Sequence, residues 1–328
     1  MTLLTIAIPT YERPQQLAQI CEQLRDVTAH LDNIRVLISD NSQTPESRQS
    51  NQQNASPFEY FSNSENLGFS GNLISIINRC NSKYLWFLSD DDLLHREEAR
   101  LMLRLLLDQS LGDFDCLMLP FTYADESGLV NTAADYGFPR DIDQLFGNAV
   151  YFPFILFSSF IINLHARPAE ISTTKMAAVL ADHNGNDLIQ IIFAISCLPK
   201  TARVDFYPQP VIHYLPGEIG RFLPSDLLRS ELEVLALLYR NDQLSRQACL
   251  ARSKACTVNQ LRYVLRIKAG VQKNLYLDSH PDFRPFPAPA LFLKHSSPFA
   301  IALWLLTCLP HGAIKLLYRV KDHVKSMH

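Results

Sequence analysis

The stretch Tyr84-Leu85-Trp86-Phe87-Leu88-Ser89-Asp90-Asp91-Asp92 decides how this chain folds. Its first five residues are large and apolar, which is typical of a strand covered on both faces of a sheet. Three carboxylates follow at the carboxyl end of that strand, the edge at which open α/β sheets bind ligands. Neighbouring carboxylates repel each other unless a positive charge lies between them. The pattern predicts a divalent cation, Mn²⁺ or Mg²⁺, and the alternative is an acidic loop that caps a helix beginning near Arg96.

The composition bounds the class of protein. The 328 residues are 47% hydrophobic and 19% charged, as in a folded globular chain with a sizeable core. The net charge of −3 carries no nucleic-acid signature. The seven cysteines form no C-x-x-C pair, which argues against a disulfide framework or a zinc site and favours a reducing compartment. We expect a cytoplasmic protein, because residues 1–9 lack the basic start and the length of a signal peptide.

Strand and helix patterns alternate over roughly the first 120 residues. Helices are expected from Pro14, through Leu73 and Ile77, and from Arg96 to about Asp108. Strands are expected at Leu3–Ile8, Ile34–Ile38, Phe58–Phe61, Tyr84–Leu88 and Cys116–Leu119. This alternation predicts an α/β fold with a parallel, doubly wound sheet.

The rest of the chain has a different character. Residues 120–225 are less regular and contain an aromatic-rich stretch at Tyr151–Phe160, which suits a variable, substrate-selecting part. Beyond Pro224 the pattern is helical, with one apolar face predicted from Leu228, Leu232, Leu235 and Leu238. We therefore expect an α/β domain over residues 1–225 and a helical region over residues 226–328.

The C-terminal segment combines an apolar run with basic residues. Phe299–Leu309 is nearly all apolar but falls short of the roughly 18 residues that a spanning helix needs. Lysines and arginines follow between Ile314 and Lys325. This pattern predicts a helix lying in the interface of an anionic membrane, so we expect peripheral association with the inner face of the cell membrane. The alternative is a helix packed on the protein body.

Polar segments follow several of the expected strands. They are Thr10–Arg13, Asp40–Ser42, Asn66–Asn72 and the aspartate triplet. The carboxyl ends of parallel strands meet at one edge, where nucleotides bind. Tyr11 could stack on a base, Asp40 could accept from a base N–H, and the glycines allow a close backbone approach to sugar or phosphate. Each segment alone is an ordinary turn or helix entry, but together they predict a nucleotide site.

At these residues the chain resembles glycosyltransferase family 2, whose members have the GT-A fold, a Rossmann-like arrangement. Ile8-Pro9-Thr10-Tyr11-Glu12-Arg13 and Ile38-Ser39-Asp40-Asn41-Ser42 look like its first two signatures, Asn66-Leu67-Gly68 with Gly71-Asn72 like the third, and Phe87–Asp92 like its metal-binding DXD region. The resemblance implies metal-dependent transfer of a sugar from a nucleotide-diphosphate donor, with inversion at the anomeric carbon. It covers roughly residues 3–215 and is most specific over the first 95.

The resemblance also implies roles for single residues. The donor would be held by Pro9, Thr10, Tyr11, Arg13, Asp40, Asn66, Gly68, Asn72 and Asp90, and by Arg221 in a later loop. The family commonly has Asp where Ser89 stands, so two registers of the triplet are open. The spacing to Leu93-Leu94 makes Asp91 the metal ligand, with Asp92 and His213 as further candidates. A strict D-x-D pattern would use Asp90 and Asp92 instead.

Inverting transfer needs a carboxylate that takes the proton of the acceptor hydroxyl. The family supplies it at the start of a helix beyond the DXD region, and Gly185–Ile192 fits that place. Asp187 is the expected base, with Asn186 in place of the family's first acid and Asp182 in reserve. The alternative for Asp187 is an acid favoured at a helix N-terminus by the macrodipole.

Two other functions remain open at this point. One is a Mg²⁺-dependent nucleotidyltransferase, although Pro9–Arg13 lacks the glycines of a phosphate loop. The other is a non-catalytic nucleotide-sugar-binding protein. For a transferase, the expected donors are linked to UDP, dTDP, GDP or CDP, and the expected acceptor is a lipid-linked glycan of bacterial surface-polysaccharide synthesis, such as O-antigen or capsule. Tyr84–Asp92 also looks like abequosyltransferase-type members, which use CDP-dideoxyhexoses.

Overall fold

The computed structural model describes residues 2–124, 130–133, 145–146, 156–167, 172–183, 186, 188–199, 201–215 and 224–268, with 305–306, 309, 313–314 and 317 near the end. The chain divides into two compact units. The first consists of residues 1–185 and 189–216, and the second of residues 186–188 and 217–328.

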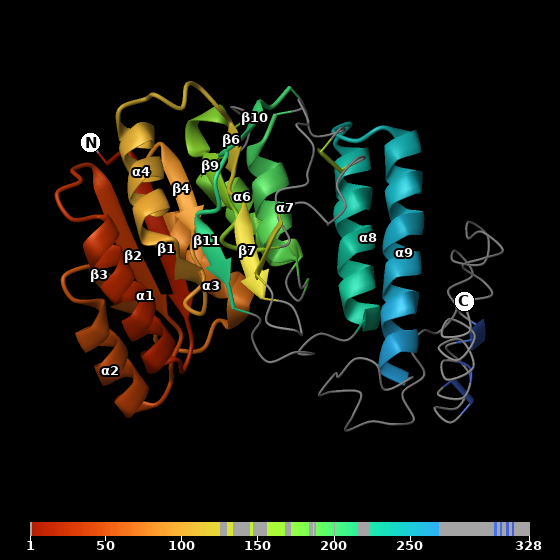
Figure 1. Cartoon of the computed structure of the whole chain (residues 1–328), viewed down its shortest axis with the longest axis horizontal. Helices are drawn as coiled ribbons and strands as arrows, with labels where there is room; N and C mark the ends of the chain where they lie inside the picture. Colours follow the sequence, from red (N-terminus) through yellow and green to blue (C-terminus); the bar gives the residue numbers. More distant parts are fainter. Residues whose placement is uncertain are drawn as a thin grey trace. The chain divides into compact units, whose positions relative to one another are not determined.

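The first unit is built on a seven-stranded sheet (Figure 1). Its strands lie in the order β10 (Val204–Phe206), β6 (Cys116–Met118), β9 (Phe160–Asn163), β4 (Tyr84–Phe87), β1 (Leu4–Thr10), β2 (Ile34–Asp40) and β3 (Glu59–Ser62). Pairs β1–β2, β1–β4, β2–β3 and β10–β6 are parallel, as the sequence predicts.

The prediction of a wholly parallel sheet is wrong at β9, which runs antiparallel to both β4 and β6. The chain reaches β9 through Ser158, whose hydroxyl accepts a hydrogen bond from the backbone N–H of Ser89 at the carboxyl end of β4. Because β9 enters the sheet at that edge, it runs back through it. A strand of four residues, three of them apolar, carries no directional signal in its sequence.

The helices of the first unit are α1 (Pro14–Val27), α2 (Pro45–Ala55), α3 (Gly68–Arg79), α4 (Arg96–Leu107), α6 (Thr173–Asp182) and α7 (Ile189–Cys197), with the short 3₁₀ helix η1 (Leu164–Ala166). Helices α1, α3 and α4 were predicted. Helix α2 was not, because it is polar and buries only Asn51 and Ala55. Its start is nevertheless marked by residue type, because Pro45 is its first residue and the side chain of Thr44 caps its N-terminus.

The two faces of the sheet are both covered, as the apolar run at 84–88 predicts. Ile6, Ile8 and Trp86 share one core with the buried sides of α1 and α4. Phe87 points to the other face, where its ring contacts Phe193 of α7 at a centroid distance of 5.2 Å. Alternate residues of β4 therefore anchor opposite layers, which fixes the position of the loop that follows it.

A second, four-stranded sheet lies within the same unit, in the order β5 (Leu93–Leu94), β11 (Ile212–Tyr214), β7 (Phe121–Ala124) and β8 (Val130–Ala133). It was not predicted, because strands of two to four residues are too short for a periodicity signal. Strand β5 begins directly after the aspartates and pairs antiparallel with β11. The triplet is therefore held between a strand of the main sheet and a strand of the small one.

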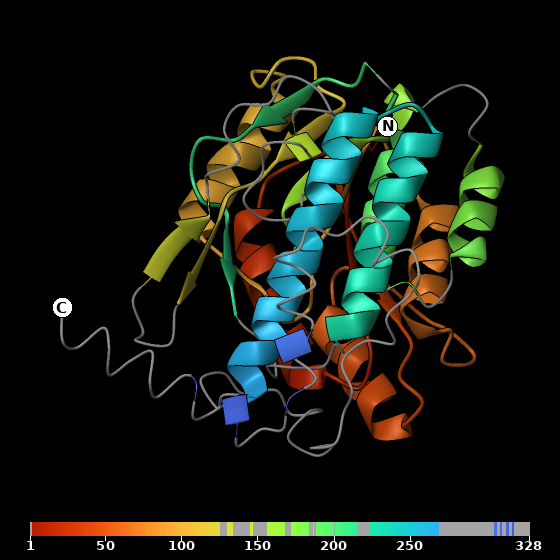
Figure 2. The same cartoon turned by 90° about the vertical axis from the view of Figure 1, so that its right-hand side faces the viewer.

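The second unit contains a helical hairpin of α8 (Pro224–Arg240) and α9 (Arg246–Lys268), which lie side by side in Figures 1 and 2. Leu228, Leu235 and Leu238 of α8 are buried as predicted, whereas Leu232 is exposed. The buried stripe passes instead through Glu231 and Val234, one position before and two positions after Leu232. Most of the predicted membrane segment lies outside the described residues. Over the part that is described, no helix combines the length and the apolar content needed to cross a bilayer.

Candidate active site

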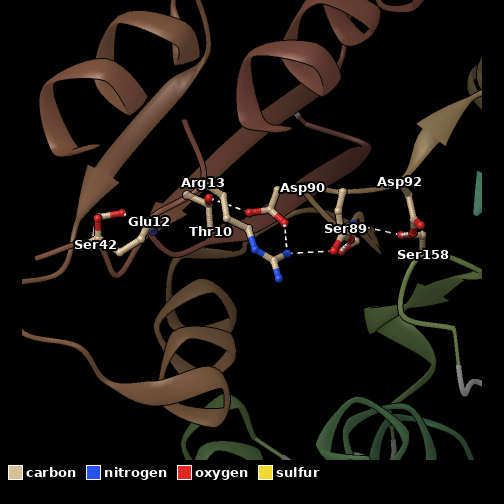
Figure 3. Close-up of polar contacts among 9 residues, drawn as sticks. Thr10, Glu12, Arg13, Ser42, Ser89, Asp90, Asp92 and Ser158 are labelled. Carbon is tan, nitrogen blue, oxygen red and sulfur yellow. Dashed lines mark hydrogen bonds and ion pairs between the residues drawn. The ribbon is translucent and has the colours of Figure 1, made fainter. Parts of the chain in front are cut away.

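The loops after β1 and β4 meet at the carboxyl edge of the main sheet. Thr10 Oγ1 donates to Asp90 Oδ2 at 2.7 Å. Arg13 Nη1 donates to Asp90 Oδ1 at 3.0 Å and to Asp91 Oδ2 at 2.8 Å (Figure 3). Strands β1 and β4 are parallel neighbours, so these loops leave the sheet side by side. Two segments about 80 positions apart thus form one polar cluster, as the sequence predicts.

The three aspartates have different environments. Asp91 is the accessible one, with 32% of its side chain exposed, whereas Asp90 is 4% and Asp92 is 1% exposed. Ser89 Oγ donates to Asp91 Oδ1 at 2.5 Å, so the serine in the place of the family's acid orients Asp91. The alternative that the triplet caps α4 is wrong, because the cap residue is His95 and no side chain bonds there.

Asp92 points into the protein. Its Oδ2 accepts from Ser158 Oγ at 2.5 Å, and its Oδ1 is buried with no hydrogen-bond partner among the described residues. Burial raises the pKa of Asp92 to about 7, with a further increase from the charges of Asp91 and Asp90. Burial likewise raises the pKa of Asp90 to about 6, against the hydrogen bond from Thr10 and the charge of Arg13. Both increases therefore come chiefly from burial, which disfavours the charged carboxylate.

The donor set suits a hard divalent cation. Carboxylate oxygens are the ligands that Mn²⁺ and Mg²⁺ prefer, and at nucleotide sites one or two of them combine with substrate phosphates. In the described part of the chain, no group of three or more His, Cys, Asp or Glu side chains is arranged to hold a metal unaided. Asp90 and Asp91 share a single guanidinium, and Asp92 Oδ1 is buried with no hydrogen-bond partner among the described residues. The residues therefore fit a cation shared between Asp91 and a bound diphosphate.

Asp40, expected to contact a base, is fully buried in a network of its own. It accepts from the backbone N–H of Ser42 at 2.7 Å, from Asn51 Nδ2 at 2.9 Å and from the Tyr60 hydroxyl at 2.8 Å. These bonds fix the loop after β2 from three directions. In this structure Asp40 shapes the loop, and neither Asn51 nor Tyr60 was singled out from the sequence.

Asn66 and Asn72 also act within the protein. Asn66 Oδ1 accepts from Gly68 N at 2.9 Å, and Gly68 has a φ of +68°, which a glycine adopts without strain. The buried Asn72 donates from Nδ2 to Ser39 O at 3.1 Å and accepts from the Ser39 hydroxyl. A Cβ on Gly71 would lie 2.7 Å from Leu67 Cβ, so this turn admits no larger residue without a shift. The segment is brought to the site edge, where Asn41 Nδ2 donates to Gly68 O at 3.0 Å.

The loop after β1 presents Tyr11 and is fastened by Glu12. Pro9 and Thr10 lie within β1 opposite Ser39 and Asp40, and the Tyr11 side chain is exposed. Glu12 has a φ of +52° and donates from its backbone N–H to Ser42 Oγ at 2.8 Å (Figure 3). Its carboxylate accepts from the backbone N–H groups of Gln43 and Thr44, the two residues that precede α2. Against the effect of burial, hydrogen bonds from Ser47, Thr44 and Gln43 lower the pKa of Glu12 to about 2.

His213, a predicted metal candidate, is hydrogen-bonded within the small sheet. Its Nδ1 is 2.8 Å from Thr122 Oγ1, which also bonds His95 Nε2 at 2.8 Å. Successive side chains of a strand point to opposite faces, so the neighbour Tyr214 faces the triplet instead. Burial and the charges of Asp92 and Asp91 raise the pKa of Tyr214. Tyr214 is thus within electrostatic reach of the aspartates, while the His213 ring bonds Thr122.

The predicted base Asp187 and the predicted phosphate contact Arg221 lie outside the described residues. The neighbour Asn186 is described and buried: its Oδ1 accepts from Leu188 N at 2.8 Å, and its Nδ2 donates to Glu233 Oε2 of α8 at 2.6 Å. The reserve acid Asp182 is exposed at the end of α6.

Ser158 is the site residue that the sequence analysis missed. Besides its bonds to Asp92 and Ser89, its carbonyl oxygen accepts from Trp86 Nε1 at 2.8 Å. Its signal was weak: a Ser-Ser pair at the end of the aromatic-rich stretch 151–160, where apolar residues are otherwise the rule.

Comparisons with known proteins bear on the fold that carries this site. Residues 5–126 match the model of the family described as "Glycosyl transferase family 2". No curated protein sequence matches the chain. Among solved structures, S. aureus TarS 1–349 in complex with UDP-GlcNAc has a TM-score of 0.61 at 12% identity, covering 97% of this chain and 92% of that one.

A second similar structure is that of a protein from Pyrobaculum calidifontis. The mannosyltransferase PcManGT, in complex with GDP-Man and Mn²⁺, has a TM-score of 0.52 at 11% identity, over 97% of this chain and 87% of that one. At such identities the likeness is one of fold. The chain therefore has the GT-A fold of these glycosyltransferases, and its residues 5–126 resemble glycosyltransferase family 2.

Proposed function

We propose that the chain transfers a sugar from a nucleoside-diphosphate donor to a hydroxyl of a glycan acceptor, with a divalent metal and with inversion at the anomeric carbon. The observation that carries the proposal is the accessible carboxylate of Asp91, oriented by Ser89 and Arg13 beside the buried Asp90. Similarly folded proteins have been solved with UDP-GlcNAc and with GDP-Man and Mn²⁺, which supports a nucleotide-sugar donor.

The donor would lie along the carboxyl edge of β1, β2 and β4. Tyr11, exposed at that edge, would stack on the base, while Asp90 would receive the ribose. The backbone of Pro9, Thr10 and Gly68 would line the nucleotide. Because Asp40 and Asn72 are buried and hydrogen-bonded, we propose that they act by holding this lining in shape.

The reaction needs one proton acceptor. The acceptor hydroxyl oxygen forms a bond to the anomeric carbon, the bond from that carbon to the diphosphate oxygen breaks, and Asp187 takes the hydroxyl proton. Bound at Asp91, the cation would neutralise the charge that develops on the leaving diphosphate. Ser89 holds Asp91 in place for that role, and Arg221 is the proposed further phosphate contact.

The proposed acceptor is a lipid-linked glycan of bacterial surface-polysaccharide synthesis. It rests on the apolar and basic pattern of residues 299–325, which is proposed to bind the inner face of an anionic membrane. Residues 1–225 would be the transferase domain and residues 226–328 the helical, membrane-facing region. Deleting residues 296–328 should release the protein from anionic liposomes in sedimentation. Unchanged sedimentation of the truncated chain would rule out this tail as the anchor.

The central test is donor turnover. Purified protein is mixed with Mn²⁺ and sugar donors carrying UDP, dTDP, GDP or CDP, and release of the sugar is measured without an acceptor. We expect one nucleotide to bind best, slow hydrolysis of its donor, and loss of hydrolysis with EDTA. Asp187→Asn should abolish turnover while nucleotide binding survives. Nucleotide binding with no turnover in either protein would identify a binding module, and pyrophosphate release from a nucleoside triphosphate would identify a nucleotidyltransferase.

A further inference from the structure

The N-terminus of helix α1 fixes the backbone position of Arg13. Arg13 precedes Pro14, the first residue of α1, and its carbonyl oxygen accepts from Leu17 N at 3.0 Å. Its backbone is therefore fixed, and only the side chain can adapt. The side chain reaches from the β1 loop across to the loop after β4, where 25% of it stays exposed.

One nitrogen of Arg13 serves both carboxylates. Nη1 bonds Asp90 and Asp91, and among the described residues it is the only guanidinium nitrogen that bonds to the protein (Figure 3). Nε and Nη2 keep donors for another acceptor, since a guanidinium has five N–H groups. The bonds to Asp90 and Asp91 thus use only some of the N–H donors of Arg13.

The position of Nη1 conflicts with a metal at Asp91. Asp91 Oδ1 accepts from Ser89, and Oδ2 accepts from Arg13. A divalent cation on Oδ2 would meet the guanidinium at the same oxygen, and two positive charges a few ångströms apart repel. Arg13 therefore occupies the place of positive charge that the cation would take.

We propose that Arg13 is an exchangeable counter-ion: it neutralises Asp90 and Asp91 in the free protein, and it yields Asp91 to the divalent cation while its guanidinium turns to the donor's diphosphate. This inference rests on the proposed function and adds to it the change of partner that Arg13 makes when the cation and the donor bind. The planar fork of Arg matches two phosphate oxygens, so the diphosphate replaces the carboxylate as its partner.

The exchange couples the two ligands. Without the diphosphate, the cation must displace Arg13 with no new partner for the guanidinium, so the cation alone binds weakly. With the diphosphate present, Arg13 gains an anion as it leaves Asp91, so each ligand strengthens the other by the same factor. A residue that only braced the loop would leave the coupling to the direct contact between the cation and the diphosphate, and its removal would not make the cation alone bind more tightly.

The experiment measures Mn²⁺ binding, by the signal of free Mn²⁺ in electron paramagnetic resonance, with and without the best-binding nucleoside diphosphate at pH 8. For Arg13→Met we expect Mn²⁺ alone to bind roughly tenfold tighter than to the wild type. The diphosphate should bind roughly tenfold weaker in saturating Mn²⁺. Arg104→Met removes a positive charge from the exposed side of α4 and should match the wild type.

Arg13→Lys keeps the charge without the fork, so Mn²⁺ alone should bind within about threefold of the wild type while the diphosphate loses affinity. Nitrogen-15 spectra of the wild-type arginine side chains, with diamagnetic Mg²⁺ and diphosphate, follow the exchange without any variant. Mn²⁺ binding to Arg13→Met that is unchanged or weaker, or an Arg13 signal unmoved by saturation, would overturn the proposal. If the wild type itself bound neither Mn²⁺ nor any diphosphate, the proposed function would fail instead.

Discussion

Ser158 Oγ donates a hydrogen bond of 2.5 Å to Asp92 Oδ2 across 66 positions of sequence. The same hydroxyl accepts from the backbone N–H of Ser89 at 2.9 Å, so one side chain fastens both ends of the aspartate loop. Ser158 is fully buried, and its carbonyl oxygen holds the Trp86 indole. The loop that carries Asp91 is therefore shaped by a residue from the segment leading into β9.

The first prediction concerns this serine. Ser158→Ala leaves the fully buried Asp92 without a donor and the partly buried Ser89 N–H without an acceptor. Each such loss costs about 1–3 kcal/mol, so we expect the free energy of unfolding to fall by about 2–4 kcal/mol in urea titrations, with weaker Mn²⁺ binding. The matched control is Ser159→Ala, which removes a single bond to Leu156 O and should cost about 1 kcal/mol. Equal effects of the two variants would refute the special role of Ser158.

The second prediction is a pH dependence that Asp92 produces in the metal-free protein. Its pKa is raised to about 7, so the folded state holds the proton more tightly than the unfolded chain does. The resulting stabilisation is complete below pH ~4 and is lost as the pH rises through about 7. Asp92→Asn removes this titration. Its stability relative to the wild type should therefore rise by about 2–3 kcal/mol between pH 5 and pH 8.

Thermal and urea unfolding in EDTA at several pH values provide the measurement for Asp92→Asn. The exposed Asp182 provides the control, since Asp182→Asn should keep the pH profile of the wild type. A difference between Asp92→Asn and wild type that stays constant from pH 5 to pH 8 would show that Asp92 is ionised throughout.

The sequence predicted those parts of the site that rest on one strand and its own loop. The run 84–88 and the three aspartates fix β4 and its exit, and the same logic places Thr10 and Arg13 after β1. The prediction from sequence failed where contacts between two distant segments determine which side chain faces the site. Nothing local distinguishes Ser158 from Ser159, or His213 from Tyr214, until the antiparallel entry of β9 and the pairing of β11 decide which one faces the aspartates.

Asp40, which was predicted to contact a base, shows the same dependence on distant segments. Its place after β2 was predicted, but the donors that surround it come from α2 and β3. Helix α2 has no apolar stripe by which to recognise it, so the burial of Asp40 could not be foreseen. A polar residue at a ligand-binding edge can thus serve the loop that forms the edge.

The third prediction tests that role. Tyr60→Phe removes the hydroxyl that donates to Asp40 Oδ2 at 2.8 Å. A buried carboxylate that loses one of its donors costs about 1–3 kcal/mol, so we expect an equivalent loss in the free energy of unfolding. Tyr239→Phe, on the exposed side of α8, should change stability by less than about 0.5 kcal/mol. Nucleotide affinity should fall as well, because the loop after β2 loosens. If the stability of Tyr60→Phe equals that of Tyr239→Phe, the Asp40 network does not hold the loop.

The fourth prediction decides the register of the triplet. If Asp91 holds the cation with the diphosphate, Asp91→Asn should lower Mn²⁺-dependent donor hydrolysis by about a hundredfold, which corresponds to about 2.7 kcal/mol of transition-state stabilisation. Asp92→Asn should retain most of the hydrolysis at pH 8, because Asp92 is buried and bonded to Ser158. A strict D-x-D site requires the opposite order, with Asp90 and Asp92 essential and Asp91 dispensable. Initial rates at saturating donor, compared with Mn²⁺ binding to each variant, separate the two registers. A variant that lost hydrolysis but kept Mn²⁺ binding would place its aspartate on the donor and off the metal.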